Sequence, residues 1–130
     1  MQPLAGCTLG HGYWKNHQEA WPVSSLELGV ATYDAAALDL LLSRPPRGDA
    51  SVVLAHHLIA AELNVANGAS TVQEIGLAHE WLAAQGNLLP LGIRANTDAG
   101  AEALALAEAL EEYNEGLRGP GHCSESASAL

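Results

Sequence analysis

The sequence predicts an all-α fold: a single compact domain of about five helices around one central apolar helix. The main observation is the stretch 50–67, ASVVLAHHLIAAELNVAN, which carries one formal charge, Glu62, and is otherwise largely apolar. A helix that is apolar on nearly every side is buried on nearly every side. Composition agrees, because alanine and leucine are abundant, Phe is absent and β-branched residues are scattered rather than clustered, which favours helices over sheet.

The first expected helix spans residues 12–20, GYWKNHQEA. It places Trp14, His17 and Trp21 at helical spacing on one aromatic face. Pro22 disfavours a helical backbone at the residue before it and therefore ends the element.

The next stretch, residues 24–31 (SSLELGVA), alternates weakly between polar and apolar side chains. Because no partner strand is evident elsewhere, and an isolated strand is not stable, we expect a loop there. Thr32 or Asp34 then caps a helix that runs to about Ser43, where two prolines stop it.

Each of the three remaining helices follows a side chain that can cap its first turn. The expected pairs are Asp49 before 50–67, Ser70 before 71–85 and Thr97 before 98–115. Residues 86–96 form a loop that is too apolar to lie free in solvent. We assign residues 1–123 to the helical domain and 124–130, SESASAL, to a flexible tail or linker.

Charge and hydropathy exclude several partners. Fifteen acidic residues against five basic ones give a net charge of −10, with the cations spread along the chain, so nucleic acids and anionic membranes are poor partners. No apolar run approaches the roughly 20 residues that a membrane span needs, and the first six residues lack the features of a signal peptide.

The two cysteines, Cys7 and Cys123, lie near opposite ends of the chain. Their spacing fits neither a CxxC redox motif nor a zinc knuckle, whereas the termini of a compact domain often lie close together. We therefore expect a disulfide and an oxidising compartment, secreted or cell-surface. The alternative is a pair of buried free thiols in a cytosolic protein.

Several short sequence motifs resemble those of a module found in secreted and cell-surface proteins of bacteria. They are Cys7-Thr8, the GYWKNH core at 12–17, the AHHLIAAELN helix at 55–64 and the closing GPGHC at 119–123. Gly10, His11 and Gln18 depart from the pattern, which has Thr, Gln and Pro at those places. The resemblance covers nearly the whole chain and implies fold and location more than function.

The six histidines raise the possibility of a metal site. If the cysteines are bonded, His11 and His122 come into one neighbourhood, and such a pair could accept Zn²⁺ or Cu²⁺ as the protein's cofactor. Against this, no two histidines lie at i, i+3 or i, i+4, and HEWLA at His79 lacks the second histidine of HExxH. The alternative is neutral histidines hydrogen-bonded in or near the core.

Catalysis has little support in the sequence. No nucleophile elbow, P-loop or dinucleotide fingerprint is present. Glu62 could act as a base if its pKa were raised on the apolar helix, but pairing with a cation such as Lys15 is the simpler expectation. Tyr13, Trp14 and Trp21 could form a carbohydrate-stacking platform, although aromatic residues at helical spacing more often belong to the core.

The sequence thus favours a non-catalytic extracellular module for structure, adhesion or assembly, with protein partners or self-assembly. The alternative is a histidine-based metal-binding protein or metal-dependent enzyme. We expect the 12–17 segment to hold the chain ends onto the central helix. The candidate residues for this contact are Tyr13, Trp14, Lys15, Asn16, His17 and Trp21 on one side and His56, His57 and Glu62 on the other.

Overall fold

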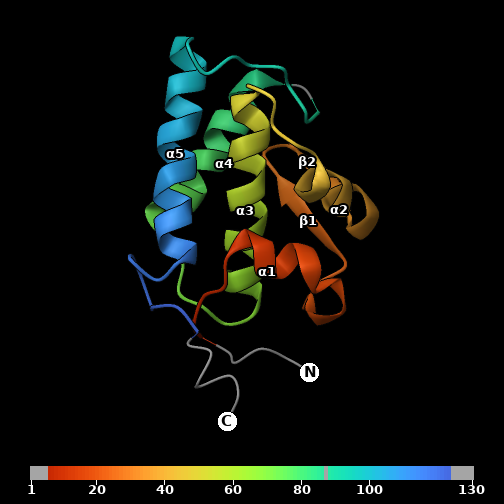
Figure 1. Ribbon diagram of the computed structural model, residues 1–130, viewed down its shortest axis with the longest axis vertical. Helices are drawn as coiled ribbons and strands as arrows, with labels where there is room; N and C mark the ends of the chain where they lie inside the picture. Colours follow the sequence, from red (N-terminus) through yellow and green to blue (C-terminus); the bar gives the residue numbers. More distant parts are fainter. Residues whose placement is uncertain (1–5, 87, 124–130) are drawn as a thin grey trace.

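The computed structural model describes residues 6–86 and 88–123, and all structural statements below concern that part of the chain. Five α-helices, one short 3₁₀ helix and one β-hairpin surround the helix α3 (Figure 1). In chain order the elements are α1 His11–Asn16, η1 Gln18–Ala20, β1 Ser25–Leu28, β2 Ala31–Asp34, α2 Ala35–Ser43, α3 Ala50–Ala66, α4 Gln73–Gln85 and α5 Asp98–Asn114.

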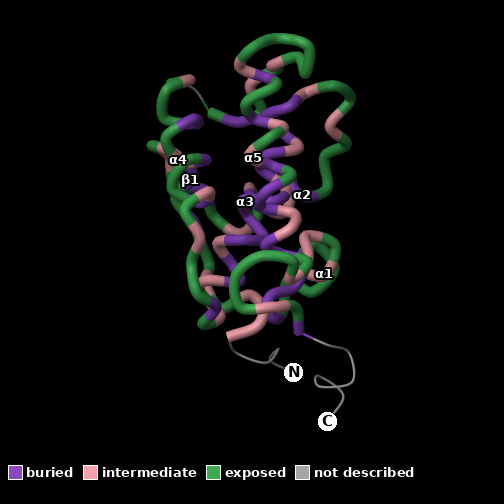
Figure 2. Tube along the Cα trace, turned by 90° about the vertical axis from the view of Figure 1, so that its left-hand side faces the viewer, coloured by how far each residue is buried: buried purple, intermediate pink, exposed green. Residues whose placement is uncertain are grey.

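Helix α3 is central, as the sequence predicts. Most of its residues are buried, and Figure 2 shows its trace purple along much of its length. Its N-cap is Asp49, whose carboxylate accepts hydrogen bonds from the Ser51 N–H at 3.0 Å and from the loop N–H groups of Gly92 at 2.9 Å and Ile93 at 3.1 Å. One carboxylate therefore both begins the helix and fixes the following long loop to it.

The other elements cover α3 from different sides. Helix α5 packs most extensively against α3, α4 lies against both, and α1, α2 and β1 contact α3 elsewhere. In Figure 1, α5 and α2 stand on opposite sides of α3, and α1 crosses in front of its lower half. Within the described residues, none of the helices combines the length and apolar character needed to cross a bilayer.

The hairpin makes the prediction of an all-α fold wrong. Strands β1 and β2 pair antiparallel over four residues each. Strand β1 lies in the 24–31 stretch where we expected a loop, and β2 continues from residue 31 to Asp34, the N-cap of α2. Gly29 begins the connecting turn with φ +67° and Leu28 lies opposite Ala31, so the loop has two residues. Two strands suffice here because Leu26, Leu28 and Tyr33 are buried against the helices, which an isolated hairpin could not achieve.

Two helix boundaries also differ from expectation. The 12–20 segment divides at His17 into α1 and η1, because residue 17 leaves the helical region with φ −133° and ψ 55°. Helix α4 begins at Gln73 with no side-chain cap, so Ser70 is not its N-cap. The Ser70 carbonyl instead accepts a hydrogen bond of 2.6 Å from the Tyr113 hydroxyl of α5. The Asp34, Asp49 and Thr97 caps are present.

Candidate functional site

The predicted disulfide between Cys7 and Cys123 is confirmed, with a Cα–Cα distance of 4.9 Å. A short backbone ladder flanks it: the Thr8 N–H donates to the Gly121 carbonyl at 2.9 Å, and the Cys123 N–H donates to the Thr8 carbonyl at 2.8 Å. The chain ends are therefore joined by hydrogen bonds as well as by sulfur. The tail at 124–130 lies outside the described residues.

Gly116 permits the closing segment to approach this closely. Its φ is +86°, and a Cβ at this position would collide with the backbone nitrogen of His122. Only glycine combines that backbone conformation with that space. Gly119 similarly lies against the ring of Tyr113, so the closing GPGHC segment packs on the end of α5.

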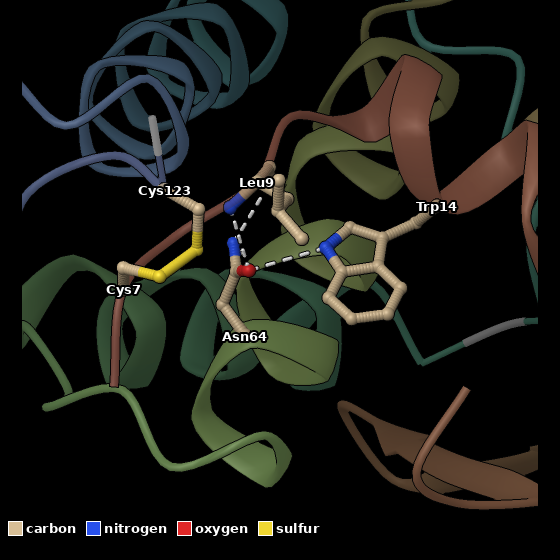
Figure 3. The surroundings of a disulfide bond; sticks show 5 residues. All are labelled: Cys7, Leu9, Trp14, Asn64 and Cys123. Carbon is tan, nitrogen blue, oxygen red and sulfur yellow. Dashed lines mark hydrogen bonds between the residues drawn. A yellow bond between two sulfur atoms is a disulfide. The ribbon is translucent and has the colours of Figure 1, made fainter. Parts of the chain in front are cut away.

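Asn64 on α3 receives the N-terminal segment. Its side-chain oxygen accepts from the Leu9 N–H at 2.8 Å and from the indole Nε1–H of Trp14 at 3.2 Å, and its amide nitrogen donates to the Leu9 carbonyl at 2.8 Å. Figure 3 shows these bonds beside the disulfide. Both Asn64 and Trp14 are fully buried. The Trp14 indole thus docks on α3 with its polar atom paired.

The same network continues to α5. The Asn64 amide nitrogen also donates to the side-chain oxygen of Asn114 at 3.0 Å, and the Asn114 amide nitrogen donates to the His57 carbonyl at 3.0 Å. A chain of buried amides therefore links the N-terminal segment, α3 and α5. Such networks stabilise a unique arrangement only when every member is paired, which is the case for these two amide side chains.

The remaining residues of the N-terminal motif lie nearer the surface. Trp21 is half-buried and donates its indole N–H to the Trp14 carbonyl at 2.8 Å. His17 is exposed, stacks on Tyr13 with ring centroids 4.3 Å apart and bonds Glu19 at 3.1 Å. Lys15 and Asn16 are exposed. Of the predicted aromatic face, Trp14 alone is fully buried.

Three imidazoles meet between α1 and α3. His11 stacks on His56 with centroids 5.7 Å apart and meets the edge of His57 at 4.7 Å. Burial lowers the pKa of His57 to about 4, with repulsion from the other two rings adding to the effect. Burial also lowers the pKa of His56, whose Nε2–H donates to the Leu41 carbonyl at 2.8 Å.

The structure brings the metal candidate His11 to His56 and His57, while the second candidate, His122, is exposed in the closing segment, where its backbone forms a bridge with Thr8. Among the described residues, no group of three or more His, Cys, Asp or Glu side chains is arranged to hold a metal ion. The Nδ1 atom of His57 is buried and has no hydrogen-bond partner there.

Glu62 pairs with His79 of α4, not with Lys15. The His79 Nδ1 accepts from the Gly29 N–H at 3.0 Å, so the ring proton is on Nε2, which donates to the Glu62 carboxylate at 3.0 Å. Both ring nitrogens are occupied, and the pair fastens the hairpin turn to α3 and α4. The His79 ring has no free nitrogen to act as a general base in this arrangement.

Asn64 and Asn114 have no role predicted from the sequence, and His79 is considered there only as part of an incomplete HExxH motif. The available signal was polarity at a buried position: Asn64 is a fully polar side chain within a nearly apolar helix, and a buried amide needs partners. Its partners come from residues 50 positions or more away in sequence, so they could not be identified from local pattern. No protein-family model, curated protein or solved structure matches the chain.

Proposed function

We propose that this chain is a non-catalytic extracellular module of a bacterial secreted or cell-surface protein, used for structure, adhesion or assembly. The proposal is based on one observation, that the most distinctive residues of the chain make structural contacts. The disulfide joins Cys7 to Cys123, and Asn64 of α3 holds the segment from Leu9 to Trp14. A disulfide of this kind persists in an oxidising compartment.

Two further features support a structural role. Both ring nitrogens of His79 are used in bonds to Gly29 and Glu62 that fasten the hairpin, and Asp49 uses its carboxylate to fix the 86–96 loop. The short motifs that resemble the bacterial surface module lie in the parts that join the two terminal segments to each other and to α3. These parts are the disulfide, the GYWKNH core of α1, α3 itself and the GPGHC segment.

The test is the location and redox state of the protein in its own host. We expect it in the extracellular or cell-envelope fraction, with an intact mass about two hydrogens below that of the reduced chain and no thiol open to alkylation. Recovery from the cytosol with two alkylated cysteines would contradict the proposal.

The alternative, a histidine-based metal-binding protein or metal-dependent enzyme, rests on one observation, the contact of the His11, His56 and His57 rings, which would have to rearrange before they could hold a metal ion. It predicts about one Zn²⁺ or Cu²⁺ per chain in protein purified without chelator. It also predicts that His11→Ala removes the metal while His122→Ala retains it. Metal at well below one equivalent, with no heat of binding on titration with Zn²⁺ or Cu²⁺, favours the structural module.

A further inference from the structure

Three of the five cations of this acidic chain gather at one edge of the molecule. Arg44 and Lys15 line a cleft of about 490 Å³ beside α1, and Arg44 and Arg47 line an adjoining cleft of about 410 Å³ around Pro45 and Pro46. None of the three has an ion-pair partner among the described residues. We call Lys15, Arg44 and Arg47, together with Leu40, the basic edge.

Leu40 gives the basic edge an apolar component. It is 72% exposed, an unusual position for a leucine on a well-packed helix. Leu40 lies on α2, Arg44 is the residue that follows the last turn of that helix, and the two line a common hollow. The basic edge therefore presents an apolar side chain beside an unpaired guanidinium.

A surface that combines apolar side chains with negative charge lies between α4 and α5. A groove of about 600 Å³ separates the exposed sides of the two helices, and no cation lines it. We call it the acidic groove; its apolar lining includes Leu77, Trp81, Leu106 and Ala109, and its carboxylates are Glu74, Glu80 and Glu102.

Two of these carboxylates are available to a partner. Arg118 binds Glu74 at 3.2 Å, but Glu80 and Glu102 are exposed and have no ion pair among the described residues. Leu77 is 37% exposed and lies three residues before Glu80 on α4. The acidic groove therefore presents an exposed leucine beside unpaired carboxylates, which is the chemical complement of the basic edge.

We propose that the chain self-associates head to tail, with the basic edge of one copy seated in the acidic groove of the next. This rests on the assembly role proposed above. Figure 1 shows α2 and α5 on opposite sides of α3, so one copy can use both surfaces at once. Contacts between two different surfaces of identical chains are heterologous and build rows or rings rather than closed two-fold dimers.

Charge complementarity between the two surfaces is the argument for a second copy as the occupant. Two chains with a net charge of −10 repel each other at long range, so a contact between copies has to bring opposite charges together to offset that repulsion. The basic edge and the acidic groove supply both signs and two exposed leucines. At about 0.15 M salt the long-range repulsion is screened beyond about 8 Å. Association is therefore strongest at intermediate salt and weaker at either extreme, because very low salt restores repulsion and high salt screens the contact itself.

Sedimentation velocity on the complete chain at about 0.15 M salt tests the proposal with two variants. Arg44→Glu reverses the charge at the cation that lines both clefts of the basic edge, and Glu80→Lys with Glu102→Lys reverses the two unpaired carboxylates of the acidic groove. The parent forms concentration-dependent oligomers, whereas each variant alone has a Kd raised at least about tenfold. An equimolar mixture of the two variants associates again, because the intact basic edge of one fits the intact acidic groove of the other.

Matched controls carry the same charge changes elsewhere. Arg94→Glu matches the first variant, and Glu27→Lys with Glu115→Lys matches the second; all three sites are exposed and without ion pairs in the described structure. Both controls associate like the parent. A parent that stays monomeric up to millimolar concentration overturns the self-association alone and leaves the module proposal to its own compartment test. A variant mixture that stays monomeric, or controls that lose association equally, also overturns it.

Discussion

The side chain of Asn64 hydrogen-bonds both backbone polar groups of Leu9, 55 positions away in the chain. The two bonds are 2.8 Å each and are buried. A single amide thus replaces the two ladder bonds that a neighbouring strand would make, and it positions the segment that leads from Cys7 to Trp14. No other residue type of similar size supplies both a donor and an acceptor in this geometry.

Asn64→Ala should therefore lower the free energy of unfolding by about 3–5 kcal/mol, because it leaves the Leu9 backbone groups, the Trp14 indole N–H and the side-chain oxygen of Asn114 without these partners. Asn64→Asp should be at least as harmful, since a carboxylate cannot donate to the Leu9 carbonyl and its charge would be buried. Urea denaturation measures both. Asn16→Ala is the control, and because Asn16 is exposed it should change stability by no more than about 0.5 kcal/mol.

Trp14→Ala should cost about 3–5 kcal/mol, the range for deleting a large buried aromatic side chain. His17→Ala should stay within about 0.5 kcal/mol, because His17 lies at the surface against Tyr13 and Glu19. Thermal melts of both variants beside the parent separate the two residues. Equal, small effects would show that the motif contributes a ligand-binding surface and not a structural contact.

Replacing both Cys7 and Cys123 by Ser should lower the free energy of unfolding by up to about 5 kcal/mol. The bond joins two residues that are 116 positions apart in sequence, so it restricts the unfolded chain strongly. The measured loss should be smaller if the Thr8 ladder with Gly121 and Cys123 survives. Reduction of the parent should reproduce the melting temperature of the double variant. A double variant as stable as the parent would contradict the expected contribution of the bond.

The central helix could be predicted because its signals are local: an apolar stretch, the Asp49 cap and the glycine that follows. The hairpin could not, because each strand has only four residues and its stability comes from burial of Leu26, Leu28 and Tyr33 against distant helices. Its turn residue Val30 is also an uncommon choice at that position. The alternation of polar and apolar side chains at 25–28 was visible in the sequence. The partner strand, however, is the segment directly after the turn, and that segment shows no clear alternation of its own.

The disulfide could be predicted from the position of two cysteines, but the site around it could not. Asn64, Asn114 and His79 act through partners on other elements, so their roles appear only once the helices are packed. Glu62 illustrates the same limit. The sequence indicated that it needs a partner, and Lys15 was one of several cations, whereas packing of α4 on α3 supplied a histidine.

Gly29→Ala tests the importance of the hairpin turn. The residue has φ +67°, and a Cβ there would lie 2.8 Å from the Leu82 Cβ of α4, so alanine meets both backbone strain and a collision. We expect a loss of about 2 kcal/mol or more and a weaker His79–Gly29 bond. Gly12→Ala is the matched control, because Gly12 lies in α1 with open space around it and should be neutral or slightly stabilising.

His57 should make the domain less stable in mild acid. Its pKa is about 4 in the folded chain, against an ordinary value of 6.5 when unfolded, so between these pH values the unfolded chain binds more protons than the folded one. Stability contributed by neutral His57 is therefore complete above about pH 6.5 and is lost as the pH falls towards 4, by about 3 kcal/mol in total. His56, whose pKa is also lowered, adds to the same slope.

Urea midpoints from pH 7.5 to 4 should show this decline in the parent and a shallower one in His57→Leu. Equal slopes in the parent and His57→Leu would show that carboxylates, not the buried imidazole, set the acid sensitivity.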